Sequence, residues 1–239
     1  MTSQRTYEGT ELELFERAHN WKAYWAAKVR PYVKGRALEV GAGLGANLMS
    51  FGALRGVHWT LLEPDAALCQ GIRQKIADSR LPADTRVICG MLKDLAANQL
   101  FDSIIYIDVL EHIADDRAEL AAAAERLVPG GNLLVLSPAY QALYSPFDAA
   151  IGHHRRYDRK SLLTAAPPSL EPRATLYLDS LGLMLSIINR YLARQSMPTP
   201  ATIHVWDSII VPLSRIADRV VGYRFGRSIV GIWTKPSMG

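Results

Sequence analysis

The stretch Glu39-Val40-Gly41-Ala42-Gly43-Leu44-Gly45 decides the fold of this chain. It follows an apolar run at residues 37–40 and precedes a helix-like segment at residues 46–54. Glycines at alternate positions permit positive φ and let the backbone approach a ligand closely. The free N–H groups and the dipole of a following helix favour a polar or anionic group at the same point. The stretch therefore predicts a strand, a ligand-binding glycine turn and a helix start.

A second acidic position lies 18 residues after Gly45. There the apolar segment His58-Trp59-Thr60-Leu61-Leu62 ends at Glu63. An acid at the tip of a second parallel strand is placed to accept both hydroxyls of a ribose. A helix-capping or surface role for Glu63 is the alternative interpretation.

Two further segments complete the pattern. Residues 101–112 read Phe-Asp-Ser-Ile-Ile-Tyr-Ile-Asp-Val-Leu-Glu-His, which predicts a buried strand that runs into a loop. Residues 128–136 read Val-Pro-Gly-Gly-Asn-Leu-Leu-Val-Leu, which predicts a helix stop and another buried strand. In this order, the four segments resemble the class I S-adenosylmethionine-dependent methyltransferases over about residues 36–138.

The resemblance implies a cofactor, S-adenosylmethionine, and a set of residues that hold it. The glycine loop would bind the methionine and ribose part of the cofactor, and Glu63 would bind the ribose hydroxyls. Asp108 would lie beside the amino-acid end. The residues placed around the cofactor by the loop are Glu39, Gly41, Gly43 and Gly45.

The resemblance is incomplete at the adenine end of the cofactor. Many members of the family place an acid directly after the glycine that ends strand three, where it contacts the adenine. Here Gly90 is followed by Met91. Asp94, or the backbone near residues 91–92, is therefore expected to take that role.

Strand-like and helix-like segments alternate along the chain. Strands are expected at residues 37–40, 58–62, 85–89, 103–107 and 132–137, and helices at residues 46–54, 65–79 and 115–128. Two more strands are expected at residues 173–178 and 228–234, and the roughly 50 residues between them carry helical patterning. The prediction is an α/β fold with a doubly wound, mostly parallel, seven-stranded Rossmann-like sheet and a helical insertion between strands six and seven.

Residues 10–33 predict one or two helices before the first strand, with an apolar and aromatic face. In the family that the chain resembles, an N-terminal helix commonly closes over the cofactor and part of the substrate. This implies that Trp21, Tyr24 and Trp25 line the pocket, although an ordinary helix docked on the sheet fits the same pattern. The expected organisation is one methyltransferase domain over residues 1–239, with an N-terminal helical lid (1–35), a cofactor-binding core (36–138) and an acceptor side (139–239).

Histidines follow two of the predicted strands and are candidate bases. Methyl transfer from a sulfonium needs an acceptor held in line and, for a protonated acceptor, a group that removes the proton. His112 follows strand four, and His153 and His154 follow strand five. Histidine titrates near neutral pH and suits this role. The pair Glu111-His112 can equally begin the next helix.

The segment from residue 144 to residue 157 is dense in polar and aromatic side chains. One hypothesis is an acceptor lid in which Arg155 or Arg156 pairs with a carboxylate or phosphate and Tyr157 positions the acceptor. The other is a structural role in which the arginines tie Asp148 and Asp158 to the core.

Composition excludes several classes of function. The 239 residues carry a net charge of +4, and no lysine and arginine block is long enough to indicate nucleic-acid binding. Cys69 and Cys89 are expected to be reduced core residues, so neither a disulfide framework nor a metal site is predicted. The absence of a signal-like segment predicts a cytoplasmic protein. Residues 178–192 and 203–221 are amphipathic with arginines on the polar side, which leaves peripheral membrane contact open beside simple packing on the core.

Three hypotheses for function follow. The first is an S-adenosylmethionine-dependent methyltransferase, a transferase that acts on a small, partly hydrophobic acceptor. The second is a nicotinamide-dependent oxidoreductase with a similar glycine turn, and the third is a non-catalytic relative that keeps the fold for binding. The acceptor atom and the oligomeric state are not determined by these residues.

Overall fold

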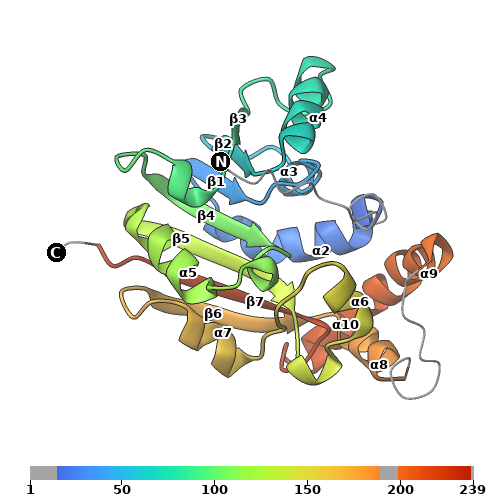
Figure 1. The fold of residues 1–239 in the computed structure, drawn as a ribbon. Helices are drawn as coiled ribbons and strands as arrows, with labels where there is room; N and C mark the ends of the chain where they lie inside the picture. Colours follow the sequence, from blue (N-terminus) through green and yellow to red (C-terminus); the bar gives the residue numbers. More distant parts are fainter. Residues whose placement is uncertain (1–14, 189–198, 238–239) are drawn as a thin grey trace.

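A seven-stranded sheet forms the centre of the molecule, in the order β3-β2-β1-β4-β5-β7-β6 (Figure 1). The computed structural model describes residues 15–188 and 199–237, so residues 10–14 of the predicted first helix and 189–192 of the first amphipathic segment lie outside the described residues. Strands β1 to β5 run parallel to one another, whereas β7 is antiparallel to both β5 and β6. The strands are β1 (Arg36–Val40), β2 (His58–Glu63), β3 (Arg86–Cys89), β4 (Phe101–Ile107), β5 (Leu127–Pro138), β6 (Glu171–Leu178) and β7 (Ser228–Thr234). The predicted mostly parallel sheet is confirmed.

Helices cover both faces of this sheet (Figure 1). One face carries α2 (His19–Val29), α3 (Leu48–Phe51), α4 (Ala66–Ala77) and the helices of the insertion, and the other carries α5 (Asp116–Glu125) and α7 (Arg159–Ala165). The insertion between β6 and β7 contains α8 (Ser180–Ile188), α9 (Pro200–Val205), a π-helical turn (Trp206–Ile210) and α10 (Val211–Val220). A short helix, α6 (Pro146–Ala150), lies in the segment after β5. The doubly wound arrangement and the helical insertion are thus as the sequence predicts.

Strand β4 shows how the sequence builds two cores. Ile105 and Ile107 pack into the cluster beneath α2 and the insertion, whereas Ile104 and Tyr106 pack into the cluster beneath α5 and α7. Successive side chains of a strand point to opposite faces, so an uninterrupted apolar run suits a strand that is covered on both sides. The ends of β1 and β4 therefore lie side by side in the middle of a covered sheet.

Two helices are shorter than the sequence predicts. In place of a helix at residues 46–54, α3 spans only Leu48–Phe51, because Gly52 takes φ +63° and ends it. In place of a helix to residue 128, α5 ends at Glu125, and Leu127 already pairs with Phe101 of β4. The Pro-Gly-Gly turn at residues 129–131 therefore belongs to an irregular part of β5 and is not a helix stop.

Buried acids join α2 to the insertion. Asp207 accepts a hydrogen bond from the Trp21 backbone N–H at 2.8 Å, and Asp218 accepts one from the Tyr24 hydroxyl at 2.7 Å. Asp218 also accepts from the backbone N–H groups of Asp179 and Ser180. Charge-assisted bonds of this kind contribute roughly 1.5–3 kcal/mol each. They fix α2 against elements that follow it by nearly 200 positions in the chain.

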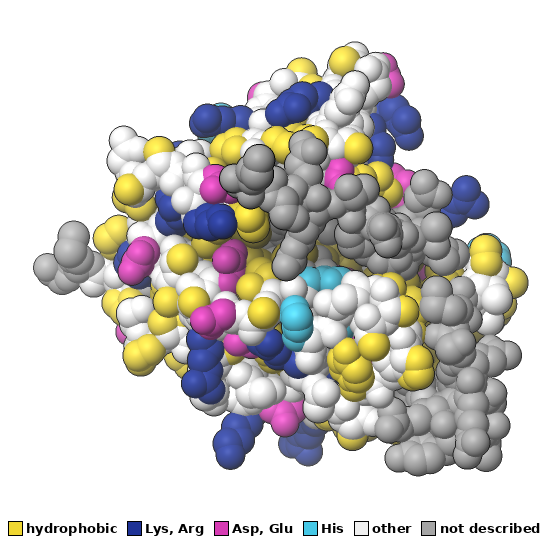
Figure 2. Space-filling model, viewed as in Figure 1, with side chains coloured by type: hydrophobic (Ala, Val, Ile, Leu, Met, Phe, Trp, Pro, Cys, Tyr) yellow, Lys and Arg dark blue, Asp and Glu magenta, His cyan; other side chains and the backbone are white. Residues whose placement is uncertain are grey.

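The surface agrees in part with the expectations from composition. On the face shown in Figure 2, Lys and Arg side chains are scattered among acidic and apolar ones. Among the described residues, no helix is long and apolar enough to cross a membrane. Cys69 is buried, as expected, but Cys89 is exposed because β3 is an edge strand. The insertion exposes large apolar side chains, namely Met184, Leu185, Ile187, Ile188, Val205, Ile209, Leu213, Ile216 and Val220.

Candidate active site

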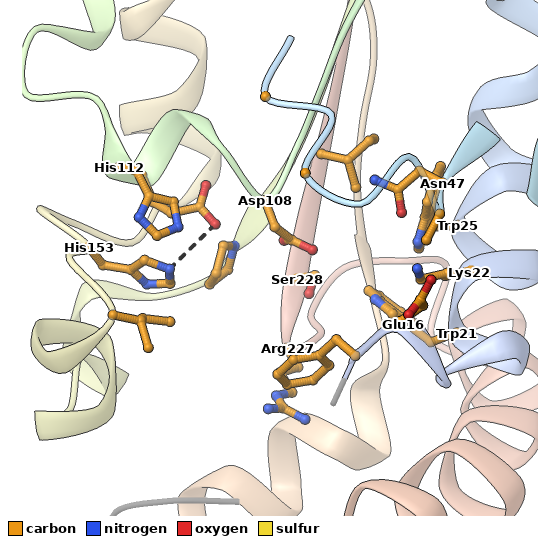
Figure 3. Close-up of a pocket in the computed structure, with 18 of the residues that line it drawn as sticks. Glu16, Trp21, Lys22, Trp25, Asn47, Asp108, His112, His153, Arg227 and Ser228 are labelled. Atoms are coloured by element: carbon orange, nitrogen blue, oxygen red, sulfur yellow. Dashed lines mark ion pairs between the residues drawn. The ribbon is translucent and has the colours of Figure 1, made fainter. Parts of the chain in front are cut away.

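A cavity lies at the carboxyl ends of β1, β4 and β5, where α2, α6 and the start of β7 close around them (Figure 3). Open α/β sheets bind ligands at the point where the strand order reverses, here between β1 and β4. In the close-up, Asp108 lies between the histidines on one side and the side chains of α2 on the other. The cavity is lined by Phe15, Glu16, Trp21, Lys22, Trp25, the loop residues 41–44, Ala46, Asn47, Ile107, Asp108, Glu111, His112, Pro138, Phe147, Asp148, Ile151, His153, Arg156, Trp206, Arg227 and Ser228.

The glycine loop has the backbone that the sequence predicts. Gly41, Gly43 and Gly45 have φ of +68°, +56° and +70°, which are left-handed values that favour glycine. A Cβ on Gly41 would lie 2.6 Å from a methyl carbon of Val109, so a larger residue would clash as well as strain the backbone. Gly41 and Gly43 line the cavity, whereas Gly45 lies beneath the loop against Leu81.

Glu39 ends β1 beneath the loop and is fully buried. Its Oε1 accepts a hydrogen bond from the Asn47 side-chain amide at 2.9 Å, and its Oε2 has no partner among the described residues. Burial raises the pKa of this carboxyl from its ordinary 4.5 to about 7, against the opposing effects of Asn47 and the Lys22 ammonium. A buried carboxylate oxygen without a partner marks a place where a donor from a ligand would be stabilising.

Glu63 lies between the glycine loop and α4. Its Oε2 accepts from the Gly43 backbone N–H at 2.8 Å, and its Oε1 accepts from the Asp65 N–H at 2.9 Å. Burial raises the pKa of the carboxyl, and the two backbone bonds oppose this shift. Glu63 does not line the cavity described above, but an ionised carboxylate can accept about four hydrogen bonds, so its ribose contact stays a prediction that the remaining acceptor positions permit.

Asp94 has a local partner. It belongs to a single 3₁₀ turn after β3, and its Oδ2 accepts from the Met91 N–H at 2.8 Å. The carboxylate is exposed and outside the cavity. Its assignment to the adenine therefore stays a prediction from the sequence.

Asp108 follows β4 and takes a left-handed φ of +52°, which is uncommon for a residue with a side chain. The side chain is accessible from the cavity, yet the protein that surrounds the cavity raises its pKa from 3.8 to about 6 by desolvation. His153, Arg227 and Lys22 oppose this shift in that order. Strained backbone of this kind is concentrated at functional sites, because the surrounding structure must hold it in place.

The histidines divide into two groups. His112 and His153 line the cavity with their rings 4.5 Å apart in an edge-to-face arrangement (Figure 3). Burial lowers the pKa of His112 to about 4, and the neighbouring His153 adds to the shift, so the His112 ring is neutral at pH 7. His153 Nδ1 lies 2.9 Å from Asp148 Oδ1. His154, by contrast, is exposed and outside the cavity, so its assignment as a base is not supported by its position.

The two arginines and the tyrosine after α6 have structural partners. Arg155 forms an ion pair with Asp116 at 2.8 Å, and the Tyr157 hydroxyl donates to the same carboxylate at 2.7 Å. Both lie outside the cavity, where they hold the loop after β5 to the start of α5, and their contact with the acceptor stays a prediction from the sequence. Arg156 lines the cavity but is bound through two nitrogens to Asp148.

Asp158 is the N-cap of α7, where its carboxylate accepts a hydrogen bond from the Ser161 backbone N–H and forms no ion pair with an arginine among the described residues. The Tyr24 hydroxyl donates to Asp218 and its ring does not line the cavity, whereas Trp21 and Trp25 do, so a substrate contact of Tyr24 stays a prediction.

Several cavity residues escaped prediction from the sequence. Lys22 is 9% exposed, and burial lowers its pKa while Glu39, Glu16 and Asp108 oppose the shift. Arg227 lies over the Trp206 ring at 5.0 Å. No local pattern distinguishes these cations from surface residues. The helical period does place Lys22 beside Trp21 and Trp25 on the buried side of α2, which is the one signal available.

Comparisons with known proteins agree on the class. Residues 38–133 match the family model for a methyltransferase domain. A ubiquinone biosynthesis O-methyltransferase of Xylella fastidiosa is 34% identical over 113 residues, which are 46% of this chain and 45% of that protein. The corresponding protein of Xanthomonas axonopodis pv. citri is 33% identical over 114 residues, 47% of this chain and 46% of its own. The chain thus aligns with less than half the length of the curated relatives it matches.

Solved structures extend the likeness over nearly the whole chain. A geranyl diphosphate C-methyltransferase of Streptomyces coelicolor superposes with a TM-score of 0.64 at 13% identity, covering 98% of this chain and 88% of that one. The N-methyltransferase NodS of Bradyrhizobium japonicum superposes with a TM-score of 0.55 at 15% identity, covering 93% and 97%. At such identities the likeness concerns the fold alone.

The fold is Rossmann-like, the glycine loop has left-handed backbone, and residues 38–133 match a methyltransferase domain. Over this domain the chain is similar to S-adenosylmethionine-dependent methyltransferases, and the structures with a similar fold include methyltransferases bound to S-adenosylmethionine or S-adenosylhomocysteine. This agrees with the first of the three hypotheses and favours it over the nicotinamide-dependent alternative.

Proposed function

We propose that this protein transfers the methyl group of S-adenosylmethionine to a hydroxyl of a small, partly hydrophobic acceptor. The observation that carries the proposal is one cavity that combines the glycine loop with aromatic side chains and two histidines. The names of the similar proteins, ubiquinone biosynthesis O-methyltransferases, support oxygen as the acceptor atom.

The cofactor side of the cavity is built from charges of both signs. S-adenosylmethionine carries an ammonium, a carboxylate and a sulfonium. We assign the ammonium to Asp108 and the unpartnered oxygen of Glu39, and the carboxylate to Lys22, a buried cation that lines the same cavity. Gly41 and Gly43 would follow the methionine part closely, and Glu63 would accept from the ribose. Such fixed groups orient the methyl carbon without taking part in the displacement.

The acceptor side is apolar with a few polar positions. Trp21, Trp25 and Phe147 offer flat surfaces, and His112 and His153 offer ring nitrogens close to where β4 and β5 end. A hydroxyl held there would lose its proton as the new oxygen–carbon bond forms, while the carbon–sulfur electron pair stays on sulfur. Because the His112 ring is neutral at pH 7, it is in the protonation state that a base requires.

Two measurements test this proposal in sequence. Calorimetry with S-adenosylhomocysteine, the demethylated product, tests the cofactor site without an acceptor, and absence of binding at millimolar concentration would refute the assignment. Labelled S-adenosylmethionine is then incubated with alkyl-substituted phenols and catechols, and with matching anilines and thiols, followed by mass spectrometry. Methylation confined to the anilines or thiols would contradict an oxygen acceptor while leaving the cofactor assignment intact.

A further inference from the structure

The structure assigns a divalent metal site to Glu111, His112 and His153 at the acceptor end of the cavity. Each side chain offers one ligand atom, and the three atoms lie within 4.8 Å of one another. A metal with ligands at about 2.0–2.2 Å holds neighbouring ligand atoms about 3–3.5 Å apart, so a small contraction of the cluster suffices. The sequence led to no predicted metal site because only Cys69 and Cys89 were considered as metal ligands.

The first observation is an unpartnered carboxylate oxygen. Glu111 is fully buried, its Oε2 accepts from the Ser137 hydroxyl at 2.9 Å, and its Oε1 has no hydrogen-bond partner within residues 15–188 and 199–237. That free oxygen faces His153 Nε2 at 3.8 Å (Figure 3). The separation is too long for a hydrogen bond, and a buried acceptor without a donor is costly.

The second observation fixes which atom of His153 faces that oxygen. Asp148 is 1% exposed and is bound at both oxygens by Arg156, so its carboxylate acts as an acceptor toward His153 Nδ1 at 2.9 Å. When Nδ1 carries the hydrogen, Nε2 presents a lone pair. Two lone pairs, one on nitrogen and one on oxygen, therefore point at a common space, which a cation would fill.

The surroundings have the arrangement that supports metal ligands. A carboxylate behind a ligating histidine fixes the tautomer and the ring orientation, and here Asp148 lies behind His153. The His112 ring hydrogen-bonds the backbone of Gly152, and the Ser137 hydroxyl holds the second oxygen of Glu111. Arg156 and Ser145 in turn hold Asp148. All three ligands line the cavity, so one side of the metal is left for an acceptor.

The ligand set selects the class of cation. Two imidazoles and one carboxylate suit Zn²⁺ and related transition-metal ions, whereas Mg²⁺ and Ca²⁺ prefer oxygen ligands. The role of this metal in the reaction rests on the proposed function. A metal-bound acceptor hydroxyl would give its proton to solvent more readily, and the resulting oxygen would take the methyl group from the sulfonium. In that case His112 and His153 act as metal ligands, and the metal replaces the base role considered above for His112.

Direct metal binding tests the site independently of catalysis. Protein purified with a chelator and then freed of it is titrated with Co²⁺, whose visible absorption reports ligand number, and with Zn²⁺ by calorimetry. We expect one ion per chain, and at least tenfold weaker binding for Glu111→Gln and His153→Gln. His154→Gln, an exposed neighbour outside the cavity, is the matched control and should bind as the wild type does.

A fourth variant distinguishes a ligand site from a merely folded loop. Asp148→Asn keeps the size of the side chain but presents an amide to His153, so we expect roughly 10- to 100-fold weaker metal binding. Thermal unfolding of each metal-free variant confirms that it is folded. Wild-type protein that binds S-adenosylhomocysteine but no Co²⁺ or Zn²⁺ at millimolar concentration would overturn the metal site alone. Wild-type protein that fails to bind S-adenosylhomocysteine would instead refute the proposed function.

Discussion

Replacement of Glu63 by glutamine perturbs the contact between the glycine loop and α4. The carboxylate accepts from the Gly43 N–H at 2.8 Å and from the Asp65 N–H at 2.9 Å. Glutamine keeps the shape of the side chain and one acceptor oxygen, but it turns an NH₂ donor toward the other N–H group. Two effects are therefore expected, one on the unliganded fold and one on the cofactor.

Both magnitudes follow from the same hydrogen-bond energy. A hydrogen bond to a charged group contributes about 1.5–3 kcal/mol, so the loss of one such bond should lower the free energy of unfolding by about that amount. If the remaining lone pairs accept the ribose hydroxyls, the loss of one charge-assisted bond there weakens cofactor binding roughly 10- to 150-fold, because about 1.4 kcal/mol corresponds to a factor of ten.

The assay compares the two effects in one preparation. Urea unfolding measures the first, and calorimetric titration with S-adenosylhomocysteine measures the second. Glu171→Gln removes a carboxylate of the same kind from an exposed position on β6, where it pairs with Arg173 at 3.2 Å, and should change neither quantity by more than a few tenths of a kcal/mol. A folded Glu63→Gln protein with wild-type affinity would remove Glu63 from the cofactor site and leave it a purely structural role.

Three more predictions concern other parts of the chain. The pKa of Glu39 is raised from 4.5 to about 7 in the folded protein, so between these pH values the folded state holds a proton that the unfolded state has lost. The free energy of unfolding should therefore fall as the pH rises from 4.5 to 7. Urea unfolding should show a flatter pH dependence for Glu39→Gln, and an unchanged slope would contradict this assignment. Tyr157→Phe removes a 2.7 Å bond to Asp116 and should lower the free energy of unfolding by about 1–3 kcal/mol without affecting cofactor affinity, and a selective loss of affinity in calorimetry would return Tyr157 to the site. Leu213 and Ile216 are 49% and 64% exposed on α10, so the wild type should sediment with anionic vesicles and a variant with aspartate at both positions should not; wild-type protein that stays in the supernatant would refute membrane contact.

The acceptor side of the site was the part that sequence reasoning predicted least well. Arg155 and Tyr157 have the chemistry of ligand-binding residues, yet Arg155 forms an ion pair with Asp116 and the Tyr157 hydroxyl donates to the same carboxylate. Sequence reasoning assigned Glu111 at most a place at a helix start and Asp148 only a structural role with the arginines, because an isolated acid in a loop carries no signal of a binding site. Their significance comes from His153, which lies between them and which the chain brings to Glu111 from 42 positions away.

The sequence by itself determined the parallel core and the glycine loop, because these depend on short-range physics. Uninterrupted apolar runs specify strands that are covered on both faces, and glycine adopts the left-handed φ values of the loop without strain, so residues 37–63 carry much of their own structure. The tertiary structure decided which polar groups remain unpartnered. Whether Glu39, Lys22 or Glu111 is buried, and which of its atoms lacks a partner, depends on where α2 and the loop after β5 pack, and those contacts join residues far apart in the chain.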